Sequence, residues 1–249
     1  MEGLGMTNPM LELRGVEKSF GGNHVIPRLD LTLASGEITA LIGPNGAGKT
    51  TIFNLITGFL KVDAGTVTYK GEPVVGLAPE RLFRKGLART FQEVRVFGGI
   101  TVLENVLVGR EQGLGSWRQT KRNKRLAMET LALVGLEDKA SRIAGDLSYA
   151  EQKFLSLARV LGSDAELLLL DEPTSGLDGR SLDLVIDVIP HLRELNRTVL
   201  IIEHNLDVVR SIAERIVFLE SGRVIASGTA DELFARKDLA DIYFGGGSF

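Results

Sequence analysis

The sequence predicts an α/β fold in which a parallel sheet with connecting helices is preceded by several strands and interrupted by a helical insert. Apolar residues alternate at period two in the first third of the chain, and the strand signal almost vanishes between Gln92 and about residue 165. Two short, continuous apolar runs separated by a helical pattern follow. Such runs are typical of strands buried on both faces of a parallel sheet.

The first segments indicate strands and helices in turn. Period-two patterns predict strands at Leu11–Val16, Leu29–Leu33 and Ile38–Ile42. The stretch GKTTIFNLITGFL then changes to a period of about 3.6, which predicts a helix directly after a strand. GTVTYKGEPV again has strand character, and PERLFRKGLART has the pattern of a short amphipathic helix.

The insert contains only helical signals. TVLENVLVG begins with Thr101 and Glu104 at the spacing of a capping box, and WRQTKRNKRLAMETLALVGL is a longer helical pattern. LSYAEQK, residues 147–153, has the same capping-box spacing at Ser148 and Glu151 before another helix. The insert also contains a basic cluster, which we interpret as a solvated helix face. Binding to acidic lipid head groups or to a partner is the alternative interpretation. The cluster consists of Arg118, Lys121, Arg122, Lys124 and Arg125.

The last third returns to alternating strands and helices. ELLLLDEP and RTVLIIEH are the two apolar runs, and SLDLVIDVIPHLREL is the helical pattern between them. RIVFLES and GRVIASG predict two further strands before short helices and the tail GGGSF.

Composition excludes several classes of protein. The 249 residues are 44% hydrophobic and 24% charged, which suits a globular protein with a sizeable core. A net charge of −3 gives no positive field that would attract nucleic acid, so no nucleic-acid partner is expected. There is no cysteine for disulfides or thiolate metal sites. No run approaches the roughly 18 apolar residues that span a bilayer, and no secretion signal is evident.

The stretch GPNGAGKTT fits the phosphate-binding motif G-x-x-x-x-G-K-[ST] and lies between a predicted strand and a predicted helix. Glycines let backbone N–H groups wrap a phosphate, the Lys49 ammonium attracts the β and γ phosphates, and the Thr50 hydroxyl coordinates Mg²⁺. The stretch therefore predicts binding of a nucleoside triphosphate. The candidate binding residues are Gly43, Asn45, Gly46, Gly48, Lys49, Thr50 and Thr51.

Two carboxylates follow the four leucines of LLLLDEP. Asp171, at the end of the predicted buried strand, is expected to hold Mg²⁺ directly or through water. Glu172 is expected to orient or deprotonate the attacking water. Together with the phosphate-binding loop, this pair predicts hydrolysis of the bound nucleotide.

In order and spacing, these motifs resemble those of ABC-transporter ATPase subunits. They are GPNGAGKTT, RTFQ with Gln92, LSYAEQ, LLLLDEP, SGLD with Asp178, and IIEH with His204, and they cover almost the whole chain. The resemblance implies a P-loop (RecA-like) core with an N-terminal antiparallel β subdomain and an inserted α-helical subdomain. Within a single domain 1–249, residues 1–92 and 166–249 would form the core with the β subdomain, and 93–165 the helical subdomain.

The resemblance also implies roles for residues outside the strongest motifs. Phe20 would stack on adenine, although a core phenylalanine at a strand end is an equal alternative. Gln92 would contact Mg²⁺ or water, and His204 would reach the γ-phosphate. Asp178 would take part in nucleotide binding. Ser148 would contact the ATP held by another subunit, because two cassettes sandwich two nucleotides head to tail.

LSYAEQ departs from the common family signature L-S-G-G-Q. Tyr149 and Ala150 replace the glycines, and Glu151 replaces the glutamine. A β-carbon at Ala150 is expected to crowd a backbone that must approach the γ-phosphate. Glu151 adds negative charge near an anion, unless it turns back to its own helix start. We therefore expect a weakened half-site and favour a mixed pair of ATPase subunits.

LARTFQEVRVFGGITVLENVLVG is similar to ATPase subunits of branched-chain amino acid importers. This similarity implies ATP and Mg²⁺ as cofactors, and a second ATPase subunit in a homodimer or heterodimer. It also implies transmembrane permease subunits, an indirect periplasmic or extracellular substrate-binding protein, and a peripheral place on the cytoplasmic side of the inner (plasma) membrane. Alternatives are urea import, lipopolysaccharide export and a soluble ABC ATPase. A P-loop kinase or GTPase leaves Gln92, Ser148 and His204 unexplained.

Overall fold

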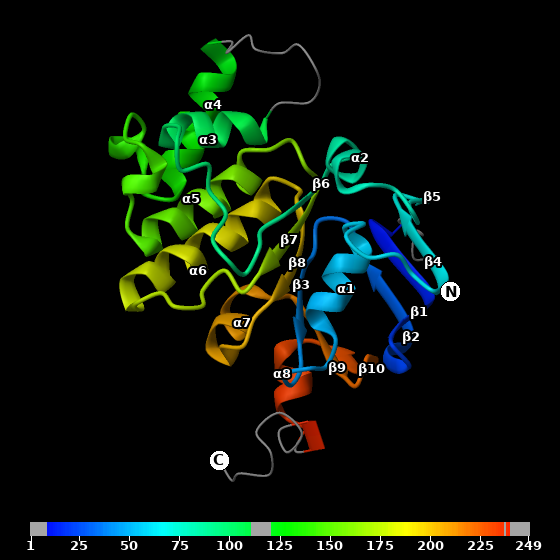
Figure 1. The fold of residues 1–249 in the computed structure, drawn as a ribbon. Helices are drawn as coiled ribbons and strands as arrows, with labels where there is room; N and C mark the ends of the chain where they lie inside the picture. Colours follow the sequence, from blue (N-terminus) through cyan, green and yellow to red (C-terminus); the bar gives the residue numbers. More distant parts are fainter. Residues whose placement is uncertain (1–8, 111–120, 237, 240–249) are drawn as a thin grey trace, which may run out of the picture.

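A computed structural model describes residues 9–110, 121–236 and 238–239, and these residues form two β-sheets flanked by helices (Figure 1). The smaller sheet is antiparallel, with the strand order β2-β1-β4-β5. Its strands are β1 (Leu11–Phe20), β2 (Asn23–Leu33), β4 (Ala64–Tyr69) and β5 (Glu72–Pro73). The predicted antiparallel N-terminal sheet is thus confirmed.

The larger sheet has the order β10-β9-β3-β8-β7-β6 and is parallel except for β10, which pairs antiparallel with β9. Its strands are β3 (Ile38–Ile42), β6 (Leu87–Arg89), β7 (Leu167–Asp171), β8 (Thr198–Ile202), β9 (Arg215–Glu220) and β10 (Arg223–Gly228). The two continuous apolar runs are the adjacent central strands β7 and β8, and every residue of both is buried. The predicted parallel sheet is therefore confirmed.

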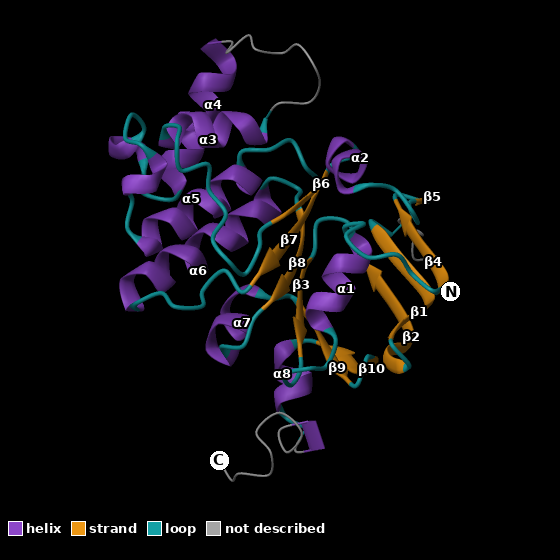
Figure 2. Cartoon of the chain, in the orientation of Figure 1, coloured by secondary structure: helices purple, strands orange, loops and turns teal. Residues whose placement is uncertain are grey.

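Most helices gather on one side of the larger sheet (Figure 2). The α-helices are α1 (Lys49–Ile56), α2 (Pro79–Arg84), α3 (Val102–Gly109), α4 (Lys121–Leu133), α5 (Tyr149–Leu161), α6 (Gly179–Glu194), α7 (Leu206–Ile212) and α8 (Ala230–Phe234). Two 3₁₀ turns, Glu137–Lys139 and Ala144–Asp146, lie between α4 and α5. The capping boxes predicted at Thr101 and Ser148 are both present.

Helices α1 and α5 lie on opposite faces of the larger sheet, as the alternating side chains of β7 show. Leu167 and Leu169 of β7 enter the same buried cluster as α1 and the smaller sheet. Leu168 and Leu170 enter the other cluster, which contains the apolar residues of α3 to α8. Because successive side chains of a strand point to opposite faces, one strand supplies both cores.

One predicted element is wrong. PERLFRKGLART is not helical throughout, because α2 ends at Arg84 and Leu87–Arg89 form strand β6. Gly86, at φ 100°, separates the two elements. Strand β6 has three residues, too few for a period-two pattern, and it is stabilised by parallel pairing with β7, which lies about eighty positions away in the chain.

The basic cluster of the insert is exposed where the structure describes it. Lys121, Arg122, Lys124 and Arg125 are exposed on α4, as a solvated helix face requires, while Arg118 lies outside the described residues. The described helices include none whose length and apolar character would let it span a bilayer.

Candidate active site

The predicted site residues that follow β3, β6, β7 and β8 meet at one edge of the larger sheet. These four strands are parallel neighbours, so their carboxyl ends point the same way. The phosphate-binding loop follows β3, Gln92 follows β6, Glu172 follows β7 and His204 follows β8. Ligands of open α/β sheets bind at this edge, so chain topology gathers motifs that are far apart in sequence.

All three glycines of the phosphate-binding loop lie in backbone conformations that L side chains rarely adopt, and at two of them a β-carbon would also be too close to neighbouring atoms. Gly43 has φ 151°, and a β-carbon there would lie 2.0 Å from the carbonyl oxygen of Leu219. Gly48 has φ 101°, and a β-carbon there would lie 2.7 Å from Cδ1 of Ile26. The loop thus needs glycine both for its shape and for its packing against β2 and β9.

The side chain of Lys49 is enclosed by the preceding residues of the phosphate-binding loop. Its Nζ donates hydrogen bonds to the carbonyl oxygens of Gly43 (2.6 Å) and Pro44 (2.9 Å), and the residue is 6% exposed. Burial lowers the pKa of the Lys49 ammonium, while the carboxylates of Glu172 and Asp171 oppose that shift. A cation is therefore held at the centre of the loop.

The N-terminus of α1 carries no competing anion among the described residues. Gly48 occupies the N-cap position without a side-chain hydrogen bond, and the first turn contains no acidic residue. The backbone N–H groups of that turn and the helix dipole therefore favour an external anion such as a phosphate. Thr50 and Thr51 lie in this first turn, and Thr50 is exposed.

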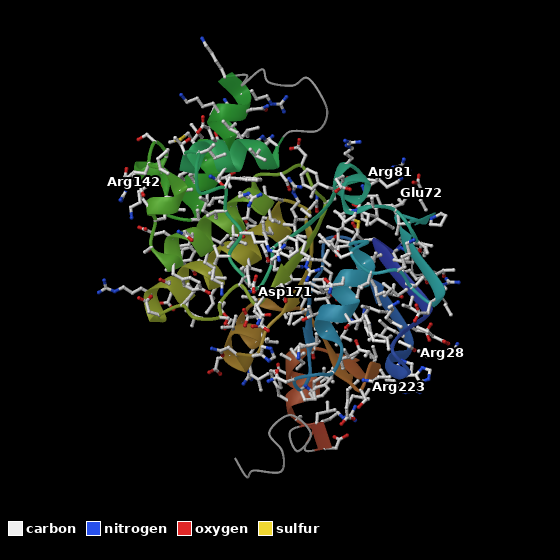
Figure 3. The ribbon with its side chains drawn as sticks, viewed as in Figure 1. Arg28, Glu72, Arg81, Arg142, Asp171 and Arg223 are labelled. Atoms are coloured by element: carbon white, nitrogen blue, oxygen red, sulfur yellow. The ribbon has the colours of Figure 1, made fainter. Side chains whose placement is uncertain are left out.

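Asp171 ends β7 near the centre of the molecule (Figure 3). Its side chain is 2% exposed, and Oδ2 accepts a hydrogen bond from Nη2 of Arg89 at 2.8 Å. Burial raises the pKa of Asp171, and the Arg89 guanidinium opposes the rise. The other oxygen, Oδ1, is buried without a hydrogen-bond partner among the described residues. A buried oxygen of this kind suits a hard cation such as Mg²⁺.

Glu172 brings the predicted residues Gln92 and His204 together. Nε2 of Gln92 donates to Glu172 Oε2 at 3.1 Å, and Nε2 of His204 lies 2.9 Å from Glu172 Oε1. Glu172 has φ 49°, which is uncommon for a residue other than glycine and is typical of strained functional positions. Two residues that lie far apart in sequence, Gln92 and His204, thus contact the same carboxylate.

Beside Glu172 lies a groove of about 310 Å³ that is lined by Asp178 and His204, among other residues. Asp178 caps α6 by accepting from the N–H of Ser181, and hydrogen bonds from the side chain and then the backbone of Ser181 lower the pKa of Asp178. Glu203, which was not predicted from the sequence, is buried and accepts from both the N–H and the hydroxyl of Thr174. Its only sequence signal was a charged residue following an apolar run.

Phe20 is 44% exposed, so the alternative that it is a core residue is wrong. It ends β1 and pairs with Asn23 in the hairpin with β2. The next residues of β2 reach the phosphate-binding loop, where Ile26 lies against Gly48. Lys18 Nζ lies 5.4 Å from the centre of the Phe20 ring.

Ser148 lies outside this cluster, at the start of α5 on the other face of the larger sheet. Its N–H donates to Glu151 Oε2 at 2.8 Å, and its hydroxyl accepts from the N–H of Glu151 at 3.4 Å. Glu151 also accepts a hydrogen bond from Lys139, and this bond lowers the pKa of Glu151 to about 2. The glutamate therefore turns back to its own helix, where a lysine that the sequence analysis missed balances its charge.

Lys153 was also missed. This residue of α5 is 7% exposed, and its ammonium donates to the carbonyl oxygen of Ser175, in the loop that leads to Asp178. Burial lowers the pKa of Lys153, while Glu203 and Glu172 oppose that shift. The signal available in the sequence was a lysine on the apolar side of a helix, which needs a buried partner.

Comparison with known proteins agrees with this geometry. A family model described as ABC transporter matches residues 26–175. The branched-chain amino acid transport ATP-binding protein BraF of Pseudomonas aeruginosa is 38% identical over 96% of this chain and 99% of its own length. LivG of Escherichia coli K12, with the same description, is 36% identical over the same shares.

Solved structures agree as well. An ATP-binding cassette of an ABC transporter in its ADP conformation has a TM-score of 0.84 and 30% identity, over 96% of this chain and 100% of that chain. A dimeric cassette in a post-hydrolysis state bound to ADP and phosphate has a TM-score of 0.78 and 26% identity, over 89% and 99%.

The fold and the site thus define a P-loop nucleotide-hydrolysing protein. More specifically, the chain belongs to the ABC transporter family. It is the ATP-binding and ATP-hydrolysing subunit of such a transporter.

Proposed function

We propose that this subunit hydrolyses MgATP to drive uptake of branched-chain or related amino acids through separate permease subunits. The observation that carries the catalytic part is the Glu172 carboxylate, which Gln92 and His204 hold at the edge of the sheet beside the phosphate-binding loop. The identities to BraF and LivG over nearly the full chain support the amino-acid cargo, which no residue of this chain needs to contact.

ATP binding uses the N-terminus of α1. Lys49 and the N–H groups of residues 43–51 receive the phosphates, and Asn45, Gly46 and Thr51 belong to this cradle. Phe20, exposed at the end of β1, offers its ring to adenine.

Mg²⁺ fits the donor set of this chain. Asp171 offers a buried oxygen without a partner, and the hydroxyl of Thr50 and the amide oxygen of Gln92 are further oxygen donors. The ion supplies charge neutralisation between the β and γ phosphates when bound. Asp171 would hold the ion through Oδ1, and Thr50 would offer its hydroxyl from the start of α1.

Glu172 orients the attacking water and draws its proton, because a carboxylate fixed on both oxygens presents a defined lone pair to that water. With ATP bound, His204 would contact the γ-phosphate instead of Glu172. Gln92 would likewise leave Glu172 to contact Mg²⁺ or water. This places Glu172, His204 and Gln92 in the hydrolytic step.

A second subunit completes the site. Ser148 begins a helix on the sheet face opposite to α1, and this position supports a role of the Ser148 of one subunit at the ATP of another. Asp178 lines the groove beside Glu172. The dimeric post-hydrolysis cassette supports this arrangement by similarity. Because Lys139 balances Glu151, the altered signature is compatible with a homodimer, and a second ATPase subunit remains the alternative.

A transport function requires further partners in addition to a second ATPase subunit. Helices α3 to α5 lie within residues 93–165, which we propose as the helical subdomain that contacts transmembrane permease subunits. A periplasmic or extracellular substrate-binding protein acts indirectly through them, and the subunit works at the cytoplasmic side of the inner membrane.

Glu172→Gln tests the hydrolytic role. The amide keeps the size of the side chain but removes the base, so we expect turnover to fall at least about 100-fold while MgATP still binds. We also expect light scattering to show a doubled mass with MgATP, because the closed dimer is trapped. Glu194→Gln, at a second histidine–glutamate pair on α6, is the matched control and should keep full turnover. Hydrolysis retained by Glu172→Gln would place the base elsewhere, and a monomeric mass with bound ATP would exclude a homodimer.

The cargo is tested in proteoliposomes that contain this subunit with its permease subunits. We expect leucine with its binding protein to raise ATP turnover several-fold, whereas urea with a urea-binding protein should not. The reverse result would move the cargo to urea.

A further inference from the structure

Arg89 is a buried residue of this site to which the proposed function gives no role. Its side chain is 6% exposed, and it ends the short edge strand β6, three residues before Gln92. A buried guanidinium is costly to desolvate, so its contacts need an explanation.

Arg89 joins the helix of the phosphate-binding loop to Asp171. Nη2 donates to Oδ2 of Asp171 at 2.8 Å, and Nη1 donates to Oδ1 of Asn54 at 2.6 Å and to Oγ1 of Thr57 at 3.3 Å. Asn54 lies in α1 and Thr57 directly follows it. The fork of the guanidinium therefore fixes Asp171 relative to the helix that begins with Lys49 and Thr50.

Neighbouring groups hold the guanidinium itself in place. The rings of Phe53 and Phe91 lie 5.3 Å and 5.1 Å from its central carbon. The next residue, Thr90, accepts a hydrogen bond from the N–H of Asp171 at 3.0 Å. Two successive residues thus hold both the backbone and the carboxylate of Asp171.

We propose that Arg89 is a positioning residue for the magnesium site: by binding Oδ2 of Asp171, it leaves Oδ1 as the oxygen available to the ion. The proposal rests on the proposed role of Asp171 in binding Mg²⁺. Arg89 acts through Asp171 and touches neither ATP nor the ion. Groups that orient a metal ligand in this way typically change metal affinity about 10–100-fold when they are removed.

The test is a titration of Mg²⁺ on the purified chain, read by the binding of a fluorescent ATP analogue. We expect the Mg²⁺ concentration at half-saturation to rise about tenfold in Arg89→Met, and less in Arg89→Lys, which keeps the charge without the fork. Binding of the analogue in EDTA should change less than about twofold, because the phosphate cradle is intact. Arg110→Met is the matched control, since Arg110 also pairs with an aspartate but lies away from the site.

The double variant Arg89→Met/Asp171→Asn shows whether Arg89 acts through Asp171. We expect Arg89→Met to have no further effect on the Mg²⁺ titration when Asp171 is already asparagine. Removing both charges also avoids a lone buried carboxylate, so this variant folds even if Arg89→Met alone does not.

Three outcomes would overturn the proposal. In the first, Arg89→Met lowers the unfolding temperature but leaves the Mg²⁺ titration unchanged, as a merely structural pair would. In the second, Arg89→Met tightens Mg²⁺ binding, which would mean that the positive charge of Arg89 repels the ion and that Arg89 does not help Asp171 to bind it. In the third, Asp171→Asn alone leaves the Mg²⁺ titration unchanged, which removes the proposed role of Asp171 itself and is thereby distinguishable from failure at Arg89.

Discussion

The starts of α1 and α5 are both helix N-termini at family motifs, but they satisfy their backbone donors in opposite ways. Gly48 begins α1 without a side-chain cap, and the first turn has no acidic residue. Ser148 begins α5 with a full capping box, and Glu151 with Lys139 completes it. A helix start without a cap gives up about 1 kcal/mol of stability and keeps its N–H groups for a ligand. A capped helix start keeps that stability, but fewer of its backbone N–H groups are free to bind an anion.

The two helix starts are therefore expected to contribute differently to the affinity for ATP. The α1 end is shaped by backbone conformation and a buried lysine, so we expect it to bind phosphate without a second subunit. The α5 end is already stabilised within its own chain and adds only a second set of contacts. We therefore expect changes at the α1 end to abolish ATP binding and changes at the α5 end to adjust turnover.

The largest expected effect is that of Gly48→Ala. A β-carbon at φ 101° strains the backbone of the loop, and Cδ1 of Ile26, 2.7 Å away, must also move, so we expect ATP affinity to fall about 100-fold, or about 2.7 kcal/mol. Fluorescence titration with an ATP analogue measures it. Gly36→Ala is the control, because Gly36 has φ 75° but no described atom within 4 Å of its β-carbon. Equal ATP affinity in the two variants would contradict the shape argument.

A smaller effect is expected for Lys139→Met at the α5 end. Because the pKa of Glu151 is lowered to about 2, its contribution to stability is complete above its ordinary pKa of 4.5 and is lost as the pH falls towards 2. Without Lys139 that pKa moves back up, and the pair is partly exposed, so we expect a loss of about 1 kcal/mol or less at pH 7.

Urea unfolding at pH 7, 5 and 3 measures this loss. The wild type and the variant should differ most at pH 7 and less at pH 3, because the contribution disappears only as the pH falls to about 2. The more exposed Lys85–Glu72 pair provides a control in Lys85→Met, with a smaller expected effect. A difference that grows as the pH falls would have the wrong sign for a lowered pKa.

The smallest expected effect is that of Ala150→Gly, which restores a glycine of the common signature. Ala150 lies in the first turn of α5 and is helical, so only the bulk of its β-carbon can weaken the half-site. We expect ATP turnover to rise by up to about twofold, with a stability loss of about 0.5–1 kcal/mol from the glycine. Ala132→Gly, on the exposed face of α4, controls for the stability loss. If ATP turnover does not rise, the hypothesis that the β-carbon of Ala150 weakens this half-site is wrong.

Local patterns allowed much of this fold to be predicted. The strands β1 to β3, β7 and β8, the helix after Gly48 and both predicted capping boxes depend on neighbours within a few residues. The strand β6 could not be predicted, because three residues carry no periodicity and their hydrogen bonds come from β7. Nor could the exposure of Phe20, which depends on how the β1–β2 hairpin lies against the rest of the molecule.

The phosphate-binding loop and the Asp171–Glu172 pair could be recognised before the structure was known, because each consists of adjacent residues, and the order of the motifs can be read directly along the chain. Only the tertiary structure decided that Arg89 holds Asp171, 82 positions away, that Lys139 balances Glu151, and that Gln92 and His204 share Glu172. The physical reason is that a lone charged residue carries no record of its partner in the sequence. Parallel strands bring distant chain segments to one edge, and burial then makes a partner necessary.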